Sequence, residues 1–186
     1  MTEITRRDLL KLAAAAPAAA FVHVAAGGAQ SGGLDFKRVA AAPSRAIGVG
    51  GEALPGVRVS RAWDGDVCRS TAVNAGRLPV RVREIVLFDV SHGLPPETRM
   101  YGEGFQMLTQ TGGTIGRPLD LGNYTDPKHY RLPEPAGSRV VYGVLTLSDG
   151  TAHHVMAFGS CRRFNGALHL RPESLQVVVE TEGLEL

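Results

Sequence analysis

The chain of 186 residues carries 20 lysines and arginines against 18 aspartates and glutamates, a formal charge of +2, and 44% of its residues are hydrophobic. This composition excludes collagen, coiled coils and disordered chains, because enough apolar side chains are present to bury the core of one domain. A net charge this close to zero gives no field that would attract nucleic acid, so we expect no nucleic-acid partner.

The N-terminus has the pattern of an export signal. Arg6 and Arg7 precede a short, alanine-rich apolar stretch and small residues that suit cleavage after Ala26 or Ala29. The apolar stretch is too short to cross a bilayer, so the sequence predicts no stable membrane span. We interpret residues 1–29 as a twin-arginine signal that engages the twin-arginine translocase, and we expect a periplasmic or secreted protein.

Residues 30–56 are rich in glycine, alanine and proline and lack sustained apolar periodicity, which is typical of a tether. From residue 57 onward, short segments with alternating or continuous apolar residues predict strands separated by polar turns. The strongest hairpin signal is Asp149-Gly150 between residues 140–148 and 151–158. Further strands are expected at 69–74, 80–88, 168–170, 174–180 and 184–186. The sequence therefore predicts an all-β domain over residues 57–186, an antiparallel β-sandwich.

One segment, residues 91–136, does not follow this pattern of short strands and polar turns. It is rich in proline and glycine, and it carries Tyr101, Phe105, Tyr124 and Tyr130. Connections of this length are uncommon unless they are functional or disordered, and the aromatic residues argue against disorder. We expect one long irregular excursion that forms a recognition surface.

Cysteines and histidines give no metal signature. Cys68 and Cys161 have no spacing typical of structural zinc, and the alternatives for them are a disulfide and two buried thiols. His153 and His154 are adjacent, so on a strand they point to opposite faces and do not share a metal, and we expect one of them to be buried and hydrogen-bonded. The sequence predicts neither a metal site nor a cofactor.

Two groups of charged residues suggest carbohydrate chemistry. Glu97, Glu103, Asp120 and Asp126 would supply a glycosidase pair if two of them came within about 5–10 Å. Arg162 and Arg163, followed by Phe164, suit a carboxylate, a cluster of sugar hydroxyls or a salt bridge between domains.

Three stretches together resemble a known family. They run from Met100 to Thr114, from Tyr124 to Tyr130 and from Ser160 to Gly166, the last continuing to Glu180–Gly183. In combination they are similar to the amino-terminal β-sandwich of bacterial alpha-galactosidases of the family 36 glycoside hydrolase type, including the raffinose-synthase-like branch. The likeness covers residues 57–186.

The resemblance implies a supersandwich-like domain, which in those enzymes precedes a (β/α)₈ barrel carrying both catalytic aspartates. The barrel and its aspartate pair are absent from this chain, so the resemblance assigns no catalytic residue to it. It implies instead a surface for carbohydrate, or for docking to a separate catalytic barrel polypeptide. The residues expected on that surface are Tyr101, Glu103, Phe105, Tyr124, Asp126, His129, Tyr130, Arg162 and Arg163.

The leading hypothesis is therefore an exported, non-catalytic β-sandwich module. One alternative is a small self-contained glycoside hydrolase that uses acids of residues 91–136. Another is a periplasmic protein-interaction module that binds no sugar.

Overall fold

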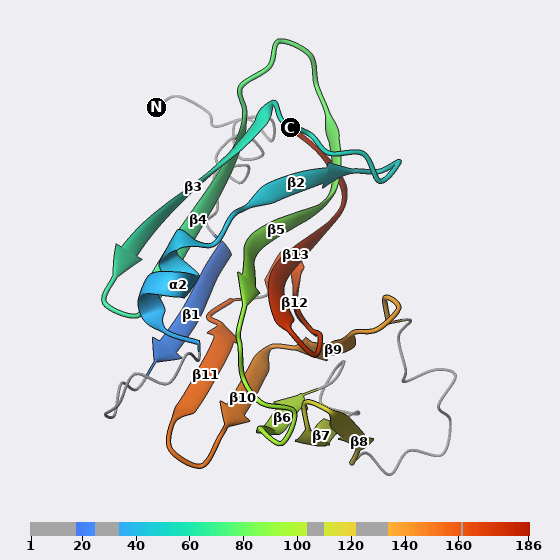
Figure 1. The fold of residues 1–186 in the computed structure, drawn as a ribbon. Coiled ribbons are helices and arrows are strands. Elements are labelled where there is room, and N and C mark those ends of the chain that lie inside the picture. Colours follow the sequence, from blue (N-terminus) through green and yellow to red (C-terminus); the bar gives the residue numbers. More distant parts are fainter. Residues whose placement is uncertain (1–17, 25–33, 104–109, 122–133, 161) are drawn as a thin grey trace.

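The computed structural model describes residues 18–24, 34–103, 110–121, 134–160 and 162–186. Within these ranges the chain forms two antiparallel sheets that face each other, with one short helix beside them (Figure 1). The prediction of an all-β antiparallel sandwich is confirmed.

The larger sheet has eight strands. In spatial order they are β3 (Val57–Asp64), β4 (Val67–Asn74), β1 (Ala18–Val24), β11 (His153–Phe158), β10 (Val144–Ser148), β6 (Arg99–Glu103), β7 (Gln110–Thr114) and β8 (Arg117–Asp120). All neighbouring strands are antiparallel. The predicted hairpin around Asp149-Gly150 is the pair β10–β11.

The smaller sheet has five strands, in the order β2 (Arg45–Gly48), β5 (Arg81–Ser91), β13 (Ser174–Glu185), β12 (Asn165–Leu170) and β9 (Arg139–Tyr142). Alternate side chains of both sheets point inward and form one continuous core, since successive residues of a strand face opposite sides. Its largest fully buried side chains include Phe88, Leu145, Leu147, Leu168 and Leu175.

The run 140–148 was expected to be one strand, but it changes sheets at Gly143. That residue has φ of +77°, a conformation that costs glycine little and other residues more. β9 therefore ends in the smaller sheet, and β10 begins in the larger one. Conversely, the two strands expected at 174–180 and 184–186 form the single strand β13, with a register irregularity around Glu182 and Gly183.

The expected tether over residues 30–56 needs correction, because residues 34–56 belong to the folded domain. Helix α2 (Phe36–Ala41) begins after Asp35, whose side chain accepts a hydrogen bond from the amide of Arg38 at 2.7 Å. β2 pairs with β5, and Leu34, Val39 and Ala46 are buried in the core. Burial of these apolar side chains holds the segment against the sandwich.

Arg61 on β3 fixes α2 in place. Its guanidinium donates hydrogen bonds to the carbonyl oxygens of Ala40 and Ala42 and lies 4.6 Å from the centre of the Phe88 ring. Burial lowers the pKa of Arg61. The side chain thereby links the larger sheet to the end of the helix and to β5 of the smaller sheet.

Acid should loosen the β10–β11 turn, because the Asp149 carboxylate organises it. Asp149 accepts hydrogen bonds from the amides of Ala152 and Thr151 and from the Thr151 hydroxyl, each at 2.8 Å. The amide of Ala152, followed by the two Thr151 donors, lowers the pKa of Asp149 from 3.8 to about 2. Because the folded pKa is depressed, the stabilisation is present above the unfolded pKa and is lost as the pH falls toward 2.

The measurement is an NMR titration of the Thr151 and Ala152 amides. We expect both resonances to shift with a midpoint near pH 2, and we expect Asp149→Asn to abolish this titration. A midpoint at the ordinary aspartate value in the native protein would contradict the role assigned to these three hydrogen bonds.

Candidate binding face on strands β6, β7 and β8

The described parts of segment 91–136 are more regular than the sequence suggests, since they supply strands β6, β7 and β8 at one end of the larger sheet. Tyr101 on β6 pairs with Thr146 on β10, and Leu119 on β8 pairs with Gly112 on β7. The β6–β7 register, in which Gly102 pairs with Thr111, puts Tyr101 level with Gly112. Thr146, Tyr101, Gly112 and Leu119 therefore form one row across four strands.

This row faces away from the smaller sheet. Met100 and Gly102, the inward neighbours of Tyr101 on β6, are buried, whereas Tyr101 is 38% exposed. Leu119 and Leu121 are 50% and 51% exposed, and the Leu121 side chain lies against Gly112. We call Tyr101, Gly112, Leu119 and Leu121 the β6–β8 platform. It is an exposed apolar patch in which the Leu121 side chain covers the buried Gly112.

Polar side chains border the platform on neighbouring strands. Arg99 and Glu103 lie on either side of Tyr101 along β6, with Arg99 exposed and Glu103 partly buried. Gln110 on β7 pairs with Glu103, and Thr114 pairs with both Arg99 and Arg117. One end of the platform thus carries two arginines and the other a carboxylate and an amide, groups that suit a ligand with many hydroxyls.

The structure places four of the nine residues expected on the recognition surface. Tyr101 and Glu103 lie together on β6. Arg162 and Arg163 are exposed on the connection from β11 to β12, and β10 separates β11 from β6, so these arginines do not join the platform. The Arg163 guanidinium lies 5.0 Å from the Phe164 ring centre. The remaining five, Phe105, Tyr124, Asp126, His129 and Tyr130, lie outside the described residues.

The acids proposed as a glycosidase pair do not converge where the structure describes them. Glu103 faces outward from β6. Asp120 pairs with the buried Thr111, so it lies in an inward-facing row, on the other face of the sheet from Glu103. Asp120 also forms an ion pair with Arg139 at 2.9 Å. Glu97 lies exposed in the connection before β6, and Asp126 is outside the described residues.

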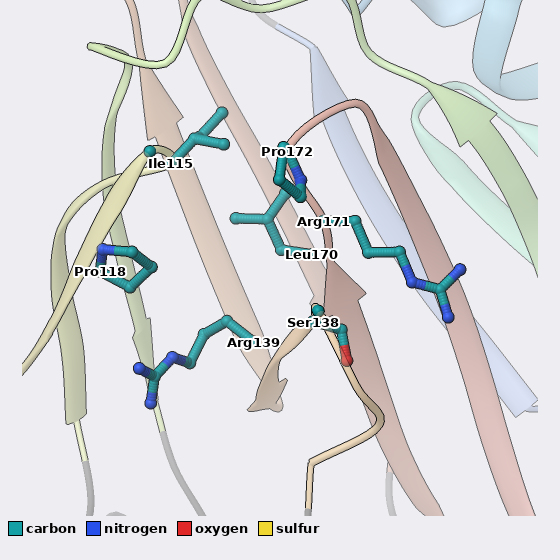
Figure 2. Close-up of a pocket in the computed structure, with 9 residues that line it drawn as sticks. Ile115, Pro118, Ser138, Arg139, Leu170, Arg171 and Pro172 are labelled. Carbon is teal, nitrogen blue, oxygen red and sulfur yellow. The ribbon is translucent and has the colours of Figure 1, made fainter.

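A hollow of about 250 Å³ lies at the open edge of the sandwich, on the opposite side of β7 and β8 from the platform. Figure 2 shows Ile115, Pro118, Leu170 and Pro172 around it, while the Arg139 and Arg171 guanidinium groups extend away from each other. Arg139 binds Asp120 at 2.9 Å and Glu134 at 3.5 Å, which ties edge strand β8 to β9. The walls are mostly apolar, and the hollow can take one aliphatic or aromatic side chain.

His153 and His154 lie on opposite faces of β11, as expected: His153 is exposed and His154 is buried. The buried ring was also expected to be hydrogen-bonded, but its Nδ1 has no hydrogen-bond partner among the described residues. Burial lowers the pKa of His154, which favours the neutral ring.

Cys68 is fully buried on β4 and forms no disulfide within the described ranges. Burial raises the pKa of its thiol. Cys161 lies outside the described residues, so the pairing of these two cysteines stays a prediction. Across the part of the chain that the structure describes, no three side chains of His, Cys, Asp or Glu form a group that could hold a metal ion.

Sequence reasoning missed Gly112, Leu119 and Leu121. The available signal was the alternation of Leu119, Asp120 and Leu121, which is typical of a strand with one apolar face. Nothing in the sequence indicates that this face meets solvent or that it lies beside Tyr101, because both depend on the pairing of β8 through β7 to β6.

The fold and the signal pattern define an exported all-β sandwich protein. The family of TAT (twin-arginine translocation) pathway signal sequences matches residues 3–23, which establishes the export route and agrees with the expected periplasmic or secreted location. No curated protein and no solved structure matches the chain significantly. In the described part of the chain, no helix has the length and apolar character needed to cross a membrane.

Proposed function

We propose that this exported protein is a non-catalytic β-sandwich module that binds carbohydrate on the β6–β8 platform. The observation that carries the proposal is the Tyr101 ring, which is 38% exposed on the outer face of the sheet in one row with the exposed Leu119. Sugar rings present apolar C–H faces that pack against an aromatic ring, and their hydroxyls bind at its polar edge. The resemblance to the amino-terminal domain of alpha-galactosidases suggests alpha-galactosides as the sugar class.

The polar border of the platform supports the same ligand class. Sugar hydroxyls both donate and accept hydrogen bonds. Glu103 can accept them, Arg99 can donate, and Gln110 and Thr146 can do both. Thr146 lies in the row of Tyr101, and the other three lie in the nearest outward-facing rows on either side of it. A ligand of one or two sugar rings could therefore contact the aromatic ring and the polar border together.

A second candidate function is docking to a separate catalytic barrel polypeptide. It is favoured by Leu119 and Leu121, which are more exposed than Tyr101 and make no hydrogen bonds through their side chains. Exposed apolar patches with a polar rim are typical of protein interfaces. In this case the platform would bury its two leucines against the partner.

Tyr101→Ala should weaken sugar binding at least about tenfold, because the stacking face is removed. The measurement is calorimetric titration of the exported protein with raffinose and related alpha-galactosides. Tyr101→Phe retains the ring and should bind nearly as the native protein does. Leu78→Ala, at a side chain 77% exposed outside the platform, is the matched surface control.

Binding that survives Tyr101→Ala would contradict the platform as the sugar site. If no alpha-galactoside binds, the carbohydrate proposal fails, and the docking function is tested by chromatography of the exported protein with a family 36 barrel polypeptide. Loss of such a complex on Leu119→Asp, but not on Leu78→Asp, would assign the platform to docking.

A further inference from the structure

Strand β1 occupies an unusual position, because it is both a central strand of the larger sheet and part of the export signal. It pairs antiparallel with β4 through Ala18–Phe21 and with β11 through Ala20–Val24 (Figure 1). The signal match covers residues 3–23, and β1 spans Ala18–Val24. Cleavage at the expected site would therefore remove a strand that has partners on both sides.

Without β1, a slot one strand wide would lie between β4 and β11. Neighbouring strands are about 4.8 Å apart, so the two edges would stand about 10 Å apart with unpaired backbone groups facing each other. The buried side chains beside the slot include Cys68 on β4 and His154 and Met156 on β11. An open slot would expose these groups to water.

The slot cannot close easily by movement of the β3–β4 hairpin. Arg61 on β3 is hydrogen-bonded to the carbonyl oxygens of Ala40 and Ala42. Trp63, also on β3, lies 4.8 Å from Phe36 on α2 and 5.9 Å from Phe88 on β5, measured between ring centres. A shift of about 5 Å toward β11 would break these contacts with the smaller sheet and the helix.

We propose that the slot between β4 and β11 in the exported protein accepts one extended strand from another polypeptide. Pairing with two backbone edges at once is the mode of β-strand addition, in which main-chain hydrogen bonds supply affinity and alternate side chains supply specificity.

The buried side chains at the two edges of the slot define the chemistry of the incoming strand. Ala20 pairs with Cys68, Val22 with Met156 and Val24 with His154. A strand in this register meets the buried Cys68, Met156 and His154 at every second position, so the partner strand needs apolar residues there, over about five residues without proline. A serine or threonine level with His154 could also reach its Nδ1, which has no hydrogen-bond partner in the described part of the chain.

The first experiment tests whether β1 occupies the slot before export. In the full chain purified from the cytoplasm of a strain without the translocase, Ala19→Cys and Arg69→Cys place two thiols at paired positions, with Cys68→Ser and Cys161→Ser added. We expect rapid disulfide formation under mild oxidation. The control combines Ala19→Cys with Ser60→Cys, one strand farther away, and should not cross-link. Equal cross-linking of both pairs would overturn the proposal.

The second experiment tests the acceptor slot itself. A fluorescent peptide of residues 18–24 is titrated into the native exported protein recovered from the periplasm, and binding is followed by anisotropy. We expect saturable binding to the exported protein and none to the full chain, whose own β1 fills the slot. A Phe21→Pro peptide should bind at least about tenfold more weakly, since Phe21 pairs with both Val67 and Ala157.

Two results would overturn the proposal. One is an exported protein that does not bind the peptide, which would mean that the sheet closes without a new strand. The other is a mass measurement showing that the exported chain retains residues 18–24, in which case its own strand fills the slot. Neither result bears on the β6–β8 platform, which lies beyond β10 on other strands.

Discussion

Replacing Gly102 with alanine is expected to destabilise the sandwich by about 3 kcal/mol, because the new methyl group has no space. A Cβ at position 102 would lie 1.9 Å from Cγ1 of Val141 on β9, a side chain that is itself fully buried. The absence of a side chain on β6 therefore allows the smaller sheet to approach directly beneath Tyr101. The measurement is urea unfolding of the purified protein.

A double variant makes this prediction specific. Val141→Ala alone should cost about 2–3 kcal/mol by leaving a cavity. In Gly102→Ala/Val141→Ala the methyl group added at position 102 can occupy the space that the Val141 side chain leaves. The loss of unfolding free energy in the double variant should therefore be smaller than the sum of the two single losses by at least about 1 kcal/mol. Gly56→Ala is the control, since nothing lies within 4 Å of its added Cβ. Additive single losses would show that the two residues do not meet.

Phe88→Ala is expected to cost about 3–5 kcal/mol, the range for removing a fully buried aromatic side chain. Phe88 lies on β5 of the smaller sheet and contacts two side chains of β3 across the core, the Arg61 guanidinium and the Trp63 ring. Its removal leaves a cavity under both residues and weakens the link between β3 and α2.

Trp63 is the only tryptophan of the chain, so its fluorescence reports directly on this contact. In Phe88→Ala we expect a red-shifted emission at temperatures where the protein is still folded, together with the lowered unfolding free energy. Val73→Ala, at a side chain 55% exposed on β4, should change neither quantity by much. An unshifted Trp63 emission in the folded Phe88→Ala protein would contradict the packing described here.

The strands were largely predictable because their signals are local. The alternation and apolar runs over 81–88 and 174–180, and the Asp149-Gly150 turn, lie within short stretches of sequence, and the structure forms strands and a hairpin there. Helix α2 was missed because it has only six residues and one buried side chain, Val39, which is too little for an apolar stripe. The fold of residues 34–56 depends instead on contacts with distant β3 and β5.

The candidate site was only half predictable. Tyr101 and Glu103 are two residues apart on one strand, so their common face follows from the period of a strand. Leu119 and Leu121 join them only through the registers of β6 with β7 and of β7 with β8. Arg162 and Arg163 are equally suitable as sequence, but they lie on the connection from β11 to β12, and β10 lies between β11 and β6.

By itself the sequence determined the export route and the all-β class, because the twin-arginine pattern and a two-residue period are read over a few neighbouring residues. Only the tertiary structure decided which residues share a surface. Gly143 sends one apolar run into two sheets, and the pairing of β6 with β10 and β7 sets Tyr101 beside Gly112. The pairing of β6 with β10 joins strands that are not neighbours in the sequence. The entropy cost of bringing such strands together is offset only when the whole core forms, so no short stretch of sequence reveals the pairing.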